Sequence, residues 1–215
     1  MSFKHCTRRA IALLLPSIFS IQAEAVNLVQ NGSFEIATNL AANSTLAPGA
    51  TNLTGWEIFG SGNLIWCNSA TYCARPAAEG TYSLDLTGLT NTFPYAGVSQ
   101  AIATTVGTKY DLTFALAGRS DSTPVSVKVL AGSLAQTFSN ASANWASQSL
   151  SFIAAASETP ISISGLSAGL SGLIIQIDNV QVQASPVPEP ASWALLVAGV
   201  FVVGAALQLS ARQNN

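Results

Sequence analysis

Histidine, cysteine and charged residues are scarce in this chain. Its 215 residues include one histidine, His5, and three cysteines, and charged residues make up 8% of the composition. His5 and Cys6 both lie in an N-terminal segment that we expect to be removed. A Ser-His-Asp triad, a Cys-His pair and a zinc centre are therefore not expected in the mature chain. The few basic residues form no stripe, so nucleic acid is not an expected partner.

The N-terminus has the parts of a secretory signal peptide. Three basic residues precede an apolar stretch at 10–21, and an A-x-A cleavage site follows at 23–25. This order indicates that residues 1–25 are removed and that the mature chain begins at Val26.

Two cysteines, Cys67 and Cys73, remain in the mature chain. An even number of cysteines in an exported protein predicts a disulfide, which here closes a short loop. The alternative of a metal site is weak, because two thiolates without further soft ligands do not hold zinc.

The C-terminus has the features of a membrane anchor. Residues 193–207 are all apolar or glycine, and Arg212 follows them. An uncharged run of this length predicts a transmembrane helix, which we place at about residues 191–209. Three prolines between 186 and 190 keep the preceding segment extended and accessible.

This tail resembles the PEP-CTERM sorting signal of Gram-negative bacteria, in which a short box, an apolar helix and a basic end follow one another. The box consists of Val187, Pro188, Glu189 and Pro190, and Arg212 supplies the basic end. The resemblance implies that a membrane-embedded exosortase recognises residues 186–215 and transfers the protein from the inner membrane to the cell surface or extracellular matrix. The alternative is a plain C-terminal anchor. Both place the main domain on the periplasmic side of the membrane.

Residues 26–185 have the length of one domain and a pattern of short strands separated by turns. The clearest alternation covers 110–117, where every second residue is apolar, and residues 125–129 repeat it. Shorter strands are predicted at 56–59 and in the opening segment, 27–35. In the last predicted strand, 173–182, the alternation shifts phase at Asp178-Asn179, which indicates a β-bulge. About ten such strands predict an all-β antiparallel sandwich. We expect a polar loop over 39–52.

Five segments of this domain, in order, resemble the DUF642 family. They are residues 27–35, Gly55-Trp56, residues 80–86, residues 97–100 and residues 177–180. The resemblance implies a galactose-binding-like jelly roll, a fold shared with many carbohydrate-binding modules, in which the first and last strands lie side by side. Plant members of the family carry two such domains in tandem, whereas this chain has one.

A structural calcium ion often lies between the first and last strands of such jelly rolls. The resemblance maps its ligands to Glu35 and Asp178, with backbone carbonyl oxygen near Asn31. Calcium takes six to eight oxygen ligands, and carboxylates and carbonyls supply them. The alternative is that both carboxylates accept hydrogen bonds from backbone amides at strand ends.

Sugar binding would use aromatic rings, because the apolar face of a pyranose stacks on a ring while neighbouring polar groups bind its hydroxyls. The candidates are Trp56, Trp66, Tyr72, Tyr95 and Trp145, and the predicted binding residues are Tyr72, Tyr95 and Trp145. Tyr72 and Tyr95 lie in polar loop sequence, and we expect them to be exposed. Trp56 is expected to be buried. For each ring a role in core packing is the alternative.

These features predict an exported, non-catalytic protein of the cell surface or matrix that binds extracellular polysaccharide. One alternative is a structural surface protein that binds no sugar. Another is a polysaccharide-processing enzyme with carboxylates such as Glu57, Asp85 or Asp121, since a glycosidase needs only two. The acidic residues form no cluster, which disfavours the enzyme.

Overall fold

The computed structural model describes residues 26–68, 73–89, 93–120, 123–166 and 172–186. The predicted signal peptide, the sorting box, the apolar run and Tyr72 lie outside this range. Within the described residues, no helix has the length and apolar character needed to cross a membrane.

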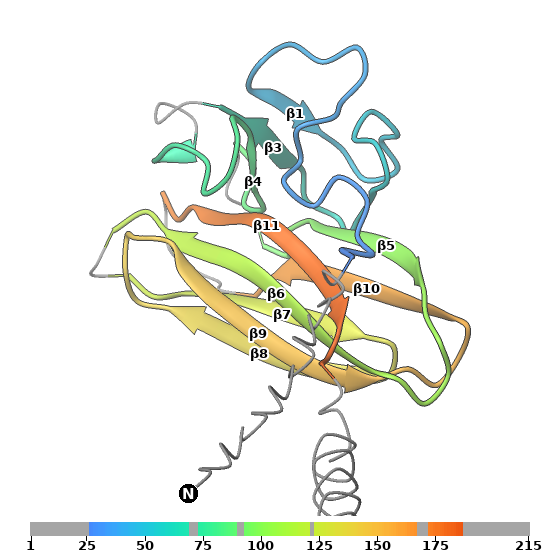
Figure 1. Ribbon diagram of the computed structural model, residues 1–215. Coiled ribbons are helices and arrows are strands. Elements are labelled where there is room, and N and C mark those ends of the chain that lie inside the picture. The colour runs from blue at the N-terminus through green and yellow to red at the C-terminus, as the bar shows by residue number, and fades with distance from the viewer. Residues whose placement is uncertain (1–25, 69–72, 90–92, 121–122, 167–171, 187–215) are drawn as a thin grey trace, which may run out of the picture.

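Two antiparallel sheets form the domain (Figure 1). The six-stranded sheet has the order β1 (Ser44–Leu46), β3 (Leu64–Cys67), β4 (Ser83–Asp85), β11 (Ile175–Ala184), β6 (Lys109–Gly118) and β9 (Ala146–Ile153). The five-stranded sheet has the order β2 (Glu57–Phe59), β5 (Gly97–Ala103), β10 (Glu158–Gly165), β7 (Val125–Ala131) and β8 (Leu134–Asn140). The prediction of an all-β jelly-roll sandwich is confirmed.

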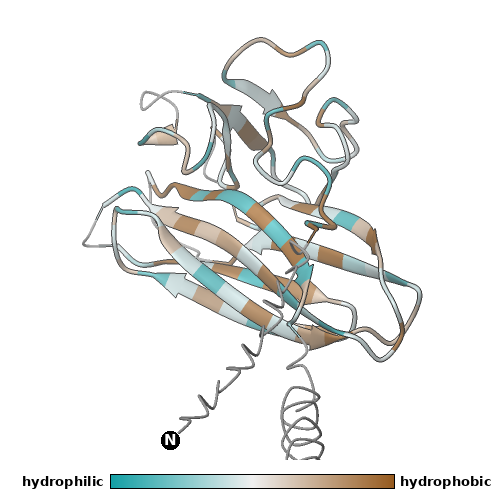
Figure 2. Cartoon of the chain, viewed as in Figure 1, coloured by the Kyte–Doolittle hydropathy of each residue, from teal (hydrophilic) through white to brown (hydrophobic). Residues whose placement is uncertain are grey.

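The core lies between the two sheets, because each strand turns every second side chain inward. In β6, Leu112, Phe114 and Leu116 are at most 1% exposed, as the alternation predicts. Facing them from the other sheet, Val127 and Val129 of β7 are fully buried. Figure 2 shows the resulting alternation of hydrophobic and hydrophilic residues along the strands.

The predicted bulge is present in β11. The register of β11 against β6 shifts between Asp178 and Gln181, and Asn179 has a positive φ of 49°. The bulge makes room for the N-terminal segment: Val180 N–H donates to the carbonyl oxygen of Gly32 at 2.9 Å. A Cβ on Gly32 would lie 1.9 Å from the carbonyl oxygen of Val180, so only glycine fits there.

Two expectations about strands were wrong, and one strand was missed. Residues 27–35 lie beside β11 as the resemblance implies, but they form turns rather than a strand. The polar loop predicted over 39–52 contains β1, and β8 was not predicted at all. Strand β8 lies at a sheet edge, where five of its seven residues are exposed, so its sequence lacks the alternation that marks a half-buried strand.

Candidate functional site

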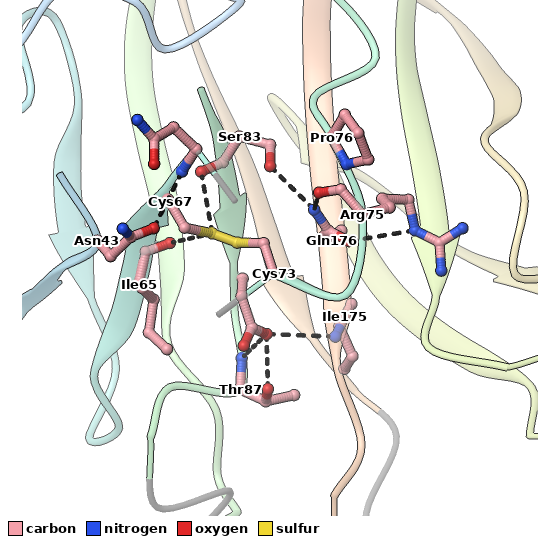
Figure 3. Close-up of a disulfide and its surroundings, with 12 residues drawn as sticks. Asn43, Ile65, Cys67, Cys73, Arg75, Pro76, Ser83, Thr87, Ile175 and Gln176 are labelled. Carbon is pink, nitrogen blue, oxygen red and sulfur yellow. Dashed lines mark hydrogen bonds between the residues drawn. A yellow bond between two sulfur atoms is a disulfide. The ribbon is translucent and has the colours of Figure 1, made fainter. Parts of the chain in front are cut away.

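The chain covers part of one outer surface with its own loop. The described part of the loop between β3 and β4, residues 73–82, crosses the sheet from β3 to β11, and we call it the covering loop. The predicted disulfide between Cys67 and Cys73 is present and joins it to β3 (Figure 3). Both cysteines are at most 1% exposed, and they pack with Ile65 in a small cluster separate from the main core. This part of the six-stranded sheet is therefore closed to ligands.

Polar side chains join the loop to the sheet beneath it (Figure 3). Arg75 Nε donates to Gln176 Oε1 at 3.2 Å, and Gln176 Nε2 donates to Ser83 Oγ at 3.0 Å. Gln176 and Ser83 are fully buried. Each bond satisfies a group that would be costly to bury alone, so this network holds the loop in place.

Asp85 is buried next to the same network. Its Oδ1 accepts hydrogen bonds from Thr87 N–H (2.9 Å), Thr87 Oγ1 (2.6 Å) and Ile175 N–H (3.3 Å). Burial raises the pKa of Asp85 to about 6, against the opposing effect of these bonds. At 1% exposure the carboxylate ties a turn to β11 and cannot reach a polysaccharide.

The two carboxylates predicted to bind calcium face backbone amides instead. Asp178 Oδ2 accepts bonds from the N–H groups of Ala78 (2.7 Å) and Glu79 (3.0 Å), and its Oδ1 accepts from Asn179 N–H. Glu35 Oε1 accepts from the N–H groups of Thr81 (2.8 Å) and Tyr82 (2.7 Å). Both side chains therefore anchor the segment 78–82, as the alternative interpretation proposed.

Asn31 also has protein partners. Its carbonyl oxygen accepts a hydrogen bond from Trp56 Nε1 at 2.9 Å. Its side-chain amide forms hydrogen bonds with the backbone of Ile36 and of Thr54. Among the residues that the structure describes, no group of three or more His, Cys, Asp or Glu side chains could hold a metal ion. Backbone amides donate to three of the four oxygens of Glu35 and Asp178, an arrangement that needs no ion, and calcium binding remains a prediction from the resemblance.

Of the predicted aromatic platforms, Tyr95 and Trp145 lie in the described residues, and neither side chain is fully exposed. Tyr95 is 4% exposed, so its predicted exposure was wrong. Its loop turns inward and packs on Gly165, where a Cβ would lie 2.9 Å from the Tyr95 Cβ. Trp145 is half-buried, and its Nε1 donates to the carbonyl oxygen of Pro76 at 3.1 Å, which fastens the covering loop. Trp56 is buried, as expected.

The outer surface of the five-stranded sheet carries two rows of side chains that cross all five strands. In the order β2-β5-β10-β7-β8, the first row is Phe59, Gly97, Ser164, Lys128 and Thr137. The second row is Glu57, Ser99, Ser162, Leu130 and Ala135. We call these ten residues the open face. Opposed residues of antiparallel strands point to the same side of a sheet, and a strand spacing of about 4.8 Å makes each row roughly 19 Å long.

Phe59 supplies an aromatic ring on the open face. Ile58 is 1% exposed and points into the core, so Phe59 points outward and is half-buried. Its ring extends over Gly97: a Cβ there would lie 2.5 Å from Phe59 Cζ and 2.8 Å from Ser164 Cβ. The glycine therefore lets the ring lie close against the sheet.

Beside the ring the surface is slightly hollowed. A hollow of about 280 Å³ is lined by Phe59, Leu130, Ser99, Ser162 and neighbouring residues. Hydroxyl groups next to an aromatic ring and an aliphatic side chain are the groups that bind the polar edge and apolar face of a sugar. Glu57 is the one carboxylate in the two rows, so the open face lacks the pair of acids that glycoside hydrolysis requires.

Phe59 was not among the predicted binding residues, although the sequence carries a signal for it. The predicted strand at 56–59 has its buried residues at 56 and 58, and strict alternation places residue 59 on the outer surface. Of the other carboxylates considered for an enzyme, Asp85 is buried and does not reach the open face, and Asp121 lies outside the described residues.

Comparisons with known proteins identify the fold. A family model described as "Protein of unknown function (DUF642)" matches residues 27–182. The CBM22-1 and GH10 modules of xylanase 10B from Clostridium thermocellum, complexed with xylohexaose, match at 12% identity and a TM-score of 0.51, over 76% of this chain and 29% of that chain. This likeness supports the jelly-roll fold alone.

Two smaller structures match less closely. TmCBM61 in complex with β-1,4-galactotriose is 14% identical with a TM-score of 0.48, over 75% of this chain and all of that chain. The CBM22-1 xylan-binding domain of Xyn10C from Paenibacillus barcinonensis is 14% identical with a TM-score of 0.45, over 69% of this chain and 99% of that chain. No protein with a curated description matches the sequence significantly.

Proposed function

The chain belongs to the DUF642 family, and from this premise we propose that it is an exported, non-catalytic surface or matrix protein that binds polysaccharide on its open face. The observation that carries the proposal is the position of the Phe59 ring, which lies over Gly97 beside a hollow and a row of hydroxyl groups. Such a surface offers stacking and hydrogen bonding along a line of about 19 Å, which suits an extended chain of sugars.

The charges favour a neutral polysaccharide. Glu57 and Lys128 balance one another in the two rows of the open face. Over residues 26–185, eight acidic and four basic side chains leave a net charge of −4. A surface of this kind does not attract an anionic polymer.

Export and sorting are proposed from the two ends of the chain. The signal peptide at 1–25 directs export, and the box at 187–190 with the apolar run behind it is the substrate of an exosortase. The protein then passes from a membrane-anchored precursor that faces the periplasm to the cell surface or matrix. In cells that lack exosortase, or with Glu189→Ala, the full-length precursor should accumulate; unchanged processing in both would favour the plain anchor.

Affinity electrophoresis tests the binding proposal. The protein is run through native gels containing xylan, β-glucan or galactan, with anionic alginate for comparison. We expect at least one neutral polysaccharide to retard the wild type, and Phe59→Ala to weaken binding about tenfold, the effect of one stacked ring. Phe93→Ala is the matched control, because Phe93 is 50% exposed but lies off the open face.

Two results would contradict the proposal. If Phe59→Ala is retarded as strongly as the wild type, then the open face does not bind sugar. If no polysaccharide retards the folded protein, the structural surface protein becomes the better interpretation.

A further inference from the structure

Large hydrophobic side chains gather at one end of the sandwich. Of the eight that are exposed in the described residues, Val26, Val106, Leu134 and Ile153 lie there, with exposed fractions of 75%, 63%, 41% and 69%. Single exposed hydrophobic residues are ordinary on a protein surface, whereas several together mark an interaction site.

Hydrogen bonds join the turns that carry these side chains. In the turn before β6, Gly107 N–H donates to the carbonyl oxygen of Ala154 at 2.8 Å, and Val106 and Ile153 flank this bond. Leu134 and Ile153 line one hollow of about 300 Å³. Val26 lines another of about 330 Å³, between the turn before β6 and the end of β11. We call this surface the exit end.

The chain leaves the domain at the exit end. Ser185 N–H donates to the carbonyl oxygen of Lys109 at 2.9 Å, directly beside the turn that carries Val106. In Figure 1 this turn and the β9–β10 turn lie at the lower right. The described residues stop at 186, and the uncharged run begins at Trp193, seven residues later. Fully extended, seven residues reach at most about 25 Å.

We propose that the exit end rests on the membrane that the C-terminal run enters, with Val106, Leu134 and Ile153 in the boundary between headgroups and acyl chains. This inference rests on the proposed function of the tail as an anchor. The short tether keeps the exit end near the bilayer, which raises its effective concentration there. Apolar side chains that project from turns then partition into the interface.

The charges at the exit end permit this contact. Lys109 and Glu158 are both exposed there, and their charges are opposite in sign. A lysine beside a bilayer keeps its ammonium group among the headgroups while its stem lies in the apolar boundary.

Docking in this way would orient the open face. Strand ends would point at the membrane, so the two rows, which cross the strands, would run roughly parallel to its surface. A polysaccharide bound along them would then lie along the cell surface.

Fluorescence quenching of residues 26–215, the chain expected after removal of the signal peptide, in vesicles of phosphatidylcholine and phosphatidylglycerol tests the contact. In this chain Cys67 and Cys73 are the only cysteines, so an introduced cysteine is the one thiol outside the disulfide. An environment-sensitive dye is attached to Val106→Cys, to Ile153→Cys or, as the control, to Thr137→Cys on the open face. Co-flotation with the vesicles is measured first, because it reports on the anchor.

We expect all three variants to co-float, and nitroxide-labelled lipid to quench the dyes at 106 and 153 at least about threefold more than the dye at 137. Co-flotation with equal quenching at all three positions would overturn the docking and leave the anchor intact. Failure to co-float would overturn both. The dyes at 106 and 153 could also report an apolar environment that is lost when the protein is diluted in lipid. That result would show contact between copies of the chain, which also contradicts the proposal.

Discussion

Asp178 allows a sharp test of how the segment 78–82 is held. Its side chain is fully buried, and burial raises its pKa from 3.8 to about 6, although the amides of Glu79, Asn179 and Ala78 act in the opposite direction. Between these two values the folded state binds a proton that the unfolded state has lost. The contribution of Asp178 to stability is therefore highest below pH 4, falls as the pH rises through about 6, and is flat above that.

The size of the effect follows from the shift. At about 1.4 kcal/mol per pKa unit, a pKa moved from 3.8 to about 6 corresponds to about 3 kcal/mol in full, of which about 2.4 kcal/mol of unfolding free energy is lost between pH 4 and pH 7.5. For a domain of this size that is roughly 5–10 °C in melting temperature. Asp178→Asn cannot titrate, so its melting temperature should fall less over the same range, by about that amount.

Differential scanning fluorimetry from pH 4 to pH 7.5 measures both proteins side by side. Comparing them cancels the contributions of Asp85 and the other acids, which titrate in each. Equal pH dependence in wild type and Asp178→Asn would refute the claim that Asp178 is a buried carboxylate held by amide groups.

Three further predictions concern the metal, the disulfide and the open face. Chelation by EDTA should leave the melting temperature unchanged, because the oxygens of Glu35 and Asp178 already accept amide hydrogen bonds; a clear fall would show bound calcium. Thiol titration should find Cys67 and Cys73 unreactive until reduction, which should then cost about 2 kcal/mol of stability for so short a loop; free thiols before reduction would count against the pairing. Gly97→Ala should displace the Phe59 ring and weaken polysaccharide binding about as much as Phe59→Ala does. Ala101→Ser, a change at an exposed position of the same strand, should bind normally. Unchanged binding by Gly97→Ala would argue against a role of the Phe59 ring in binding.

The architecture could be predicted where local pattern decides the structure. Alternation identified β6 and β7, and the phase shift at Asp178-Asn179 identified the bulge in β11. Each of these features depends on which residues face the core, and the pattern of a few neighbouring residues in the sequence indicates this. Strands β1 and β8 lie at sheet edges, where exposure removes the alternation.

The site could not be predicted in the same way, because it depends on contacts between residues that are far apart in the sequence. Tyr95 is buried because Gly165, far along the chain, leaves space for it. Phe59 becomes a platform because β5 places Gly97 beneath its ring. Glu35 and Asp178 could be paired from the family resemblance, but the resemblance did not show that backbone amides would meet them.

Chemical-shift mapping tests most directly whether the open face binds sugar. The isotope-labelled protein is titrated with an oligosaccharide of whichever polysaccharide retards it. The account predicts shifts that centre on Phe59, Ser99, Ser162 and Ser164. Shifts that centre instead on Trp145 and the covering loop, or a folded protein that shows none, would contradict it.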